Sequence, residues 1–84
     1  MESAHILAVE DSEITLFKLK AILVRLGYTV TTYANPVQAL EWLNTSGVKP
    51  DLVMTDVMMP EMDGFAFVRS IRAMPALAAV PIIM

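Results

Sequence analysis

The sequence contains no cysteine, so neither a disulfide scaffold nor a thiolate metal site can form. Charged residues are also scarce, at 18% of the 84 residues against about 25% in typical soluble domains. No apolar run reaches the ~18 residues of a membrane-spanning helix, because Lys18, Lys20 and Arg25 interrupt the richest one. The first residues have neither the basic start nor the apolar middle of a signal peptide. We therefore expect a cytoplasmic protein with no membrane segment.

A basic surface is missing as well. The formal net charge is −3 and the lysines and arginines form no patch in the sequence, which argues against binding to nucleic acid or to anionic lipid. Hydrophobic residues make up 56% of the chain, against about 45–50% in typical domains. A domain of this size has a large surface for its volume. We therefore expect that its apolar side chains are buried against a partner, or that part of the domain has been removed.

Apolar and β-branched runs alternate with helical patterns along the chain. The runs predict strands at residues 5–9, 28–33, 52–56 and 81–84. The patterns between them predict helices at residues 13–26, 36–43 and 65–73. Strands that alternate with helices indicate a parallel sheet, and the length allows one domain, so the predicted class is α/β.

The helix boundaries have recognisable signals. Asp11 or Ser12 is expected to cap the first helix, and Gly27 to end it. Asn35 and Pro36 are expected to begin the second helix, with the proline in the first turn, where its missing N–H costs nothing. The sides expected to face the core are Val37, Leu40 and Leu43 in the second helix, and Phe65, Val68 and Ile71 in the third.

Acidic residues follow two of the predicted strands. Glu10 and Asp11 come directly after the first strand, and Asp56 ends the third. Ligands bind at the carboxyl ends of the strands in an open parallel sheet, and a right-handed doubly wound order would make these two strands neighbours. Like charges about 4 Å apart repel by roughly 4 kcal/mol per pair at an effective dielectric constant near 20. We therefore expect a cation between the three carboxylates, and oxygen ligands with room for water suit Mg²⁺.

The same residue types support a reaction. A carboxylate beside bound Mg²⁺ can attack a phosphoryl group and form an aspartyl phosphate. The cation offsets the charge that develops on the transferring oxygens. The simpler interpretation is structural, with Asp56 capping the turn after its strand and Glu10 and Asp11 capping the first helix.

Four stretches, residues 6–12, 26–28, 51–64 and 80–84, closely resemble the receiver domains of two-component response regulators in order and spacing. The resemblance implies that Asp56 accepts a phosphoryl group from a sensor histidine kinase or a phosphotransfer protein. It also implies that Glu10, Asp11 and Asp56 hold Mg²⁺ together with the backbone carbonyl of Met58. A signalling domain of this kind is not expected to be an enzyme.

The resemblance further implies a flavodoxin-like receiver fold, a doubly wound parallel sheet with the strand order 2-1-3-4-5. Residues 1–84 are expected to form a truncated receiver domain that lacks the fifth strand and the fourth and fifth helices. In the family, a hydroxyl residue just past the fourth strand and a lysine at the end of the fifth contact the phosphoryl group, and this sequence ends before both.

Two alternatives stay open. The first is a degenerate receiver that dimerises as a protein-interaction module without phosphotransfer. The second is a phosphatase-like enzyme with an aspartate nucleophile. Such enzymes use a second acid two residues beyond the nucleophile, where this chain has Met58.

The first predicted helix has two apolar sides. One consists of Leu16, Leu19, Leu23 and Leu26, and the other of Ile14, Phe17, Ala21 and Val24. At 100° per residue, their centres lie about 160° apart, whereas a helix on a sheet buries one side. A fourth strand at the sheet edge would also present unpaired backbone groups to another chain. We therefore expect a homodimer, formed through the second stripe, through Val80, Ile82 and Ile83, or through both, with antiparallel strand pairing across a two-fold axis.

Overall fold

The computed structural model describes residues 3–59 and 61–84. Its helices and strands alternate along the chain as expected. In order they are β1 (His5–Val9), α1 (Glu13–Arg25), β2 (Thr29–Tyr33), α2 (Pro36–Ser46), β3 (Leu52–Thr55), α3 (Gly64–Arg72), the 3-10 helix η1 (Pro75–Leu77) and β4 (Ile82–Ile83). Over the described residues, the strands form one parallel sheet in the order β2-β1-β3-β4. This is the α/β flavodoxin-like arrangement that the sequence predicts.

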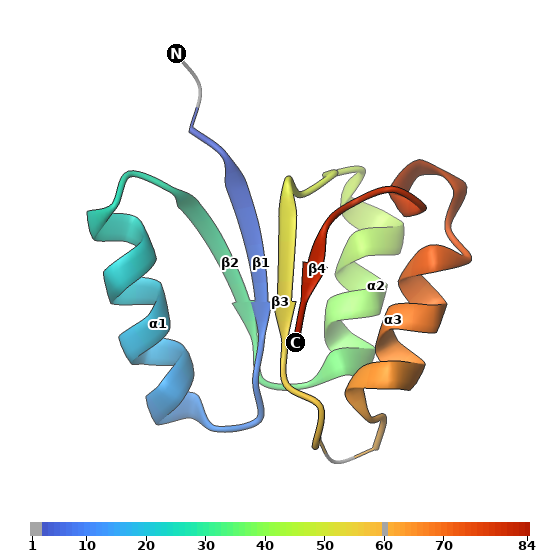
Figure 1. Ribbon diagram of the computed structural model, residues 1–84, viewed down its shortest axis with the longest axis horizontal. Helices are drawn as coiled ribbons and strands as arrows, with labels where there is room; N and C mark the ends of the chain where they lie inside the picture. Colours follow the sequence, from blue (N-terminus) through green and yellow to red (C-terminus); the bar gives the residue numbers. More distant parts are fainter. Residues whose placement is uncertain (1–2, 60) are drawn as a thin grey trace.

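The helices lie on both faces of the sheet, with α1 on one face and α2 and α3 on the other (Figure 1). Because side chains alternate along a strand, Leu7 and Val9 of β1 point to the same face as Val53 of β3. These three side chains join Phe67 and Ile71 of α3 in the main apolar core. No helix in the described parts of the chain has the length and apolar character needed to cross a bilayer.

Local signals place the helix ends. Ser12 rather than Asp11 caps α1, since its hydroxyl accepts from the backbone N–H of Thr15. Gly27 follows the helix with φ +97°, a conformation that a residue with a Cβ rarely adopts. Asn35 caps α2 and Pro36 occupies its first turn, as expected.

The predicted inner sides of α2 and α3 are confirmed at Leu43 and Ile71 and wrong at Val37 and Phe65, while Leu40 packs against the core without being fully buried. Val37 is 44% exposed and Phe65 is 53% exposed. The buried positions are Pro36, Ala39 and Leu43 in α2, and Gly64, Phe67 and Ile71 in α3. Both buried sets follow the i, i+3, i+7 spacing of a helix stripe, whereas the predicted sets were spaced by three residues throughout.

The start of β4 also differs from the prediction. Val80 was expected to present unpaired backbone groups on an exposed edge, but its side chain is only 3% exposed. Its N–H donates to the carbonyl of Leu77, and its own carbonyl accepts from Nη1 of Arg72. Val80 is therefore not available as an interface residue. Within β4, Ile82 packs against the core and Ile83 is exposed.

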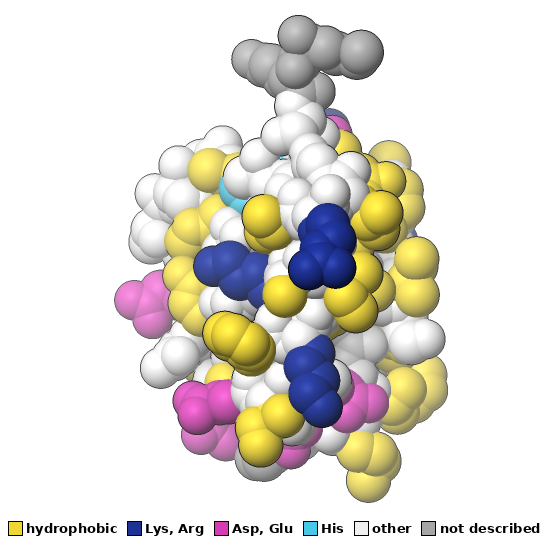
Figure 2. Space-filling view, turned by 90° about the vertical axis from the view of Figure 1, so that its left-hand side faces the viewer, with side chains coloured by type: hydrophobic (Ala, Val, Ile, Leu, Met, Phe, Trp, Pro, Cys, Tyr) yellow, Lys and Arg dark blue, Asp and Glu magenta, His cyan; other side chains and the backbone are white. Residues whose placement is uncertain are grey.

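α1 has one buried side and one exposed apolar side. Leu16 and Leu23 are buried against the sheet. The predicted outer stripe faces solvent, with Ile14 71% exposed and Phe17 77% exposed. Figure 2 shows this face, where hydrophobic side chains lie among lysines and arginines. Leu26, expected on the buried side, is exposed because the helix ends at Arg25 and Leu26 is its C-cap. A second exposed isoleucine, Ile22, also lies on α1.

Candidate functional site

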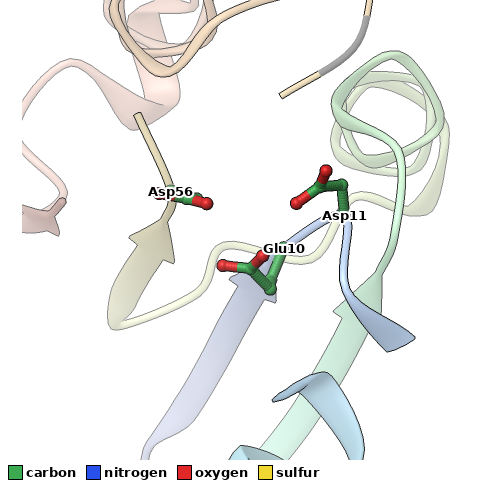
Figure 3. A group of neighbouring side chains, drawn as sticks. All are labelled: Glu10, Asp11 and Asp56. Carbon is green, nitrogen blue, oxygen red and sulfur yellow. The ribbon is translucent and has the colours of Figure 1, made fainter. Parts of the chain in front are cut away.

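Three carboxylates meet at the carboxyl end of the sheet. Glu10 and Asp11 follow β1, and Asp56 follows β3, its immediate neighbour in the sheet. One oxygen from each lies within 4.8 Å of the other two. Figure 3 shows the three side chains converging on a common space from these two strand ends. The structure thus brings together the three acids that the sequence singles out.

Backbone hydrogen bonds fix the positions of the acids. The N–H of Glu10 donates to the carbonyl of Tyr33 on β2, and the N–H of Asp56 donates to the carbonyl of Val9 on β1, each over 3.2 Å. Both acids therefore continue the ladder of the parallel sheet by one bond beyond the strand ends. The side chains of Glu10 and Asp56 therefore project from a hydrogen-bonded sheet edge, and this limits how far apart their carboxylates can move.

The surroundings of Glu10 disfavour the ionised form of its carboxyl group. Burial raises the pKa of the Glu10 carboxyl above its ordinary value of 4.5, and the neighbouring Asp11 and Asp56 raise this pKa further. The backbone N–H of Ser12, which donates to Glu10 Oε1 over 3.2 Å, acts in the opposite direction. A cation between the three groups would remove the repulsion.

The donor set fits magnesium. Mg²⁺ prefers six oxygen ligands at 2.0–2.1 Å and retains several of its waters. Oxygens bound to such an ion lie about 3 Å apart when adjacent and about 4 Å apart when opposite. The carboxylate oxygens all lie within 4.8 Å of one another, which is near enough for the three acids to hold Mg²⁺ directly or through one of its waters.

The loop between β3 and α3 borders the cluster. The N–H of Gly64 donates to the carbonyl of Val57 over 2.8 Å and closes the base of the loop, while Asp63 caps α3. Met58, with an exposed side chain, lies directly after Val57. The role of its carbonyl as a metal ligand stays a prediction. Pro60 lies outside the described residues.

Sequence reasoning missed two polar contacts around this loop. The hydroxyl of Thr55, a buried residue, donates to the carbonyl of Asp56 over 3.1 Å. The side-chain amide of Asn35 donates to Glu61 Oε2 over 3.1 Å. Only the capping role of Asn35 had a local signal, because its second contact joins residues 26 positions apart.

An apolar cleft of about 290 Å³ lies beside the acids. Glu10 and Asp56 line one end of it, and Leu19, Met54 and Ile83 form much of the rest. It separates α1 from the exposed side of β4. A small charged group at the acids would thus have an apolar wall on one side.

Comparisons with known proteins show which family the chain resembles. The family described as "Response regulator receiver domain" matches residues 6–84. Among curated proteins, the sensor kinase CckA of Brucella abortus is 42% identical over 71 residues, which are 83% of this chain and 7% of that protein. The chain thus spans a small part of this relative.

Solved structures of similar proteins cover nearly the whole chain. The chemotaxis response regulator CheY4 of Vibrio cholerae has a TM-score of 0.90 at 33% identity, covering 96% of this chain and 66% of that one. The receiver domain of a sensor histidine kinase from Pseudomonas aeruginosa has a TM-score of 0.87 at 33% identity, covering 96% and 65%. That protein was solved with a magnesium ion coordinated in its active site cleft.

Proposed function

This chain belongs to the response regulator receiver domain family of two-component signalling, and from that premise we propose that Asp56 accepts a phosphoryl group from a histidine kinase or a phosphotransfer protein. One observation carries the proposal: Asp56 directly follows β3 and has an oxygen within 4.8 Å of oxygens of Glu10 and Asp11. A carboxylate nucleophile needs nearby groups that hold a divalent cation, and these two acids supply them.

We propose Mg²⁺ as the cofactor, held by Glu10, Asp11, Asp56 and the backbone carbonyl of Met58. The ion would offset negative charge on the transferring phosphoryl oxygens. The support is the oxygen-only donor set, the raised pKa of Glu10, and the magnesium ion in the similar domain from Pseudomonas aeruginosa.

The proposed step is an in-line displacement at phosphorus. A carboxylate oxygen of Asp56 forms a bond to the phosphorus atom as the bond from phosphorus to the donor's imidazole nitrogen breaks. The electron pair of the broken bond stays on the imidazole, which takes up a proton from solvent. The carboxylate enters as the anion, so no proton leaves Asp56.

Intact-mass measurement tests the phosphoacceptor. The protein is incubated with acetyl phosphate and Mg²⁺, and the expected result is one phosphate adduct that is lost in Asp56→Asn. Asp51→Asn, at the opposite end of β3, is the matched control and should keep the adduct. An unmodified protein after this treatment would favour the alternative, a degenerate receiver that acts as an interaction module without phosphotransfer.

We also propose that residues 1–84 fold as one domain and form a homodimer. The support for the dimer is the apolar outer stripe of α1, Ile14, Phe17, Ala21 and Val24, which is exposed throughout, with exposed Ile83 as a second contact. Apolar side chains grouped on one helix side indicate contact with another protein. The cytoplasmic location expected from the sequence stays a proposal, consistent with the absence of cysteine.

A further inference from the structure

Glu61, in the loop between β3 and α3, has an unusual backbone conformation. Its φ is +70°, and among the described residues it alone has a positive φ without being glycine. A side chain with a Cβ is disfavoured in this left-handed region. Such a conformation persists only where surrounding contacts hold it, and it often occurs next to functional sites.

One such contact comes from the start of α2. The side-chain amide nitrogen of Asn35 donates to Glu61 Oε2 over 3.1 Å. The oxygen of the same amide accepts from the N–H groups of Val37 and Gln38 and so caps α2. Asn35 is therefore fixed by the helix on one side and holds the loop on the other. The negative charge of Glu61 is also favourable near a helix N-terminus.

The rest of the loop is anchored in other ways. Its base is closed by the hydrogen bond between Gly64 and Val57. Met59 is buried in the core and Met62 packs against it. These contacts hold the ends and the inner side of the loop, while Glu61 ties its outer side to α2. In Figure 1, the start of α2 and this loop lie at the same end of the molecule.

We propose that Glu61 is a positioning residue. Through Asn35, it holds the loop against α2 and thereby fixes where the Met58 carbonyl lies relative to the carboxylates of Glu10, Asp11 and Asp56. This inference rests on the proposed function, because it concerns the metal site of that function. Glu61 itself touches neither the metal ion nor the phosphoryl group in this scheme.

The two side chains allow a swap of donor and acceptor. Asn35→Asp keeps an oxygen that caps α2, because Asp is as good a cap as Asn, but it cannot donate to Glu61 and repels it. In the double variant N35D/E61Q, the amide introduced at position 61 can donate to the carboxylate introduced at position 35. The single change Glu61→Gln keeps an oxygen that can accept from Asn35. Glu61→Gly removes the side chain and relieves the positive φ, so it separates backbone strain from the contact.

Amide hydrogen exchange of residues 57–59 and 61–63 is measured without metal, and Mg²⁺ affinity is measured by titration calorimetry. For N35D, we expect faster loop exchange and about two- to fivefold weaker Mg²⁺ binding, the scale of one partly exposed hydrogen bond. In both N35D/E61Q and E61Q, the loop exchange rate and the Mg²⁺ affinity should lie within about twofold of the values for the unsubstituted protein. E61G should bind Mg²⁺ more weakly although its backbone is less strained.

Unchanged loop exchange in N35D, or Mg²⁺ affinity that does not follow the exchange, would overturn the positioning role. So would E61G binding Mg²⁺ as tightly as the unsubstituted protein, because the contact would then be unnecessary. Absence of Mg²⁺ binding by the unsubstituted protein would contradict the proposed function itself. In that case, the metal-free exchange still decides whether Asn35 and Glu61 hold the loop.

Discussion

The backbone N–H of Asp56 donates to the carbonyl of Val9 over 3.2 Å, so the acid just after β3 extends the β1–β3 ladder by one hydrogen bond, beside Glu10. The preceding pair, Val9 and Thr55, is the last one of the β1–β3 ladder. The distance between the carboxylates therefore depends on the pairing of two strands that lie more than 40 positions apart in the sequence.

The raised pKa of Glu10 predicts how stability depends on pH in the absence of metal. The folded protein keeps this proton to a higher pH than the unfolded chain, whose carboxyl has the ordinary pKa of 4.5. The contribution of Glu10 is therefore unfavourable at neutral pH and is relieved as the pH falls through the raised pKa towards 4.5. We expect Tm of Glu10→Gln to exceed that of the unsubstituted protein at about pH 7.5, and the difference to shrink near about pH 4.5.

Bound Mg²⁺ should turn the unfavourable contribution of ionised Glu10 at neutral pH into a favourable one. At about pH 7.5 the ion binds the folded protein and raises its Tm, whereas protonation of Glu10 competes with the ion at lower pH. Thermal unfolding with and without Mg²⁺ measures both effects, and Glu41→Gln, an exposed acid on α2, is the control. A Tm that ignores Mg²⁺ at neutral pH would contradict the metal site.

Gly64→Ala should be strongly destabilising. An added Cβ at this position would lie 2.9 Å from the Cα of Val57 and would also clash with the carbonyl oxygen of Asp56. Such overpacking costs about 1–3 kcal/mol, and it would displace the loop beside the acids. Gly47→Ala is the matched control, because a Cβ there meets no atom within 4 Å and costs only the strain of φ +73°. Urea unfolding should place Gly64→Ala clearly below the control; equal stabilities would contradict the close approach.

Arg72 should stabilise the segment that leads into β4. Its Nη1 donates to the carbonyls of Leu77, Ala78 and Val80, at 3.4, 3.0 and 2.6 Å. Hydrogen bonds that involve a charged group contribute about 1.5–3 kcal/mol each when buried, and less here because Arg72 is exposed. We expect Arg72→Ala to lose about 1–2 kcal/mol of stability and to accelerate hydrogen exchange at residues 80, 82 and 83.

Arg69→Ala removes the same charge from the last turn of α3 and serves as the control for Arg72→Ala. If both variants lost the same stability, the effect would belong to the helix terminus rather than to the three carbonyls.

Phe17→Ser should weaken self-association without unfolding the domain. Phe17 lies in the middle of the exposed stripe on α1, so the polar replacement removes apolar contact area but leaves the core intact. Size-exclusion chromatography with light scattering should show a dimer for the unsubstituted protein and a shift to monomer for the variant. Ile22→Ser, which changes another exposed residue of α1 outside the stripe, is the control. A stable monomer of the unsubstituted protein at micromolar concentration would contradict the dimer.

Most of the fold could be predicted because its signals are local. Asn35 followed by Pro36, and Gly27 after a helical pattern, mark helix ends through backbone geometry alone. The predictions were wrong where tertiary packing determines which side of a helix is buried. Val37 and Phe65 are apolar but exposed, whereas Ala39 and Gly64 are buried, and no local pattern separates the two pairs.

In the candidate site, too, some residues could be predicted from the sequence and some contacts could not. Glu10, Asp11 and Asp56 could be identified because acids at the ends of parallel strands must share one edge of the sheet. The contacts of Glu61 with Asn35 and of Arg72 with Val80 could not be, because each side chain could reach several partners and no local pattern selects one.

The amino-acid sequence by itself determined the α/β class and the convergence of the three acids, because alternating periodicity and strand-end chemistry act over short stretches, while the strand order followed from the resemblance of its motifs to receiver domains. Only the tertiary structure decided that Val80 is buried, that Val37 and Phe65 are exposed, and that Glu61 is held with a positive φ. Those outcomes depend on steric fit between segments distant in the chain, and that fit exists only after the sheet has formed.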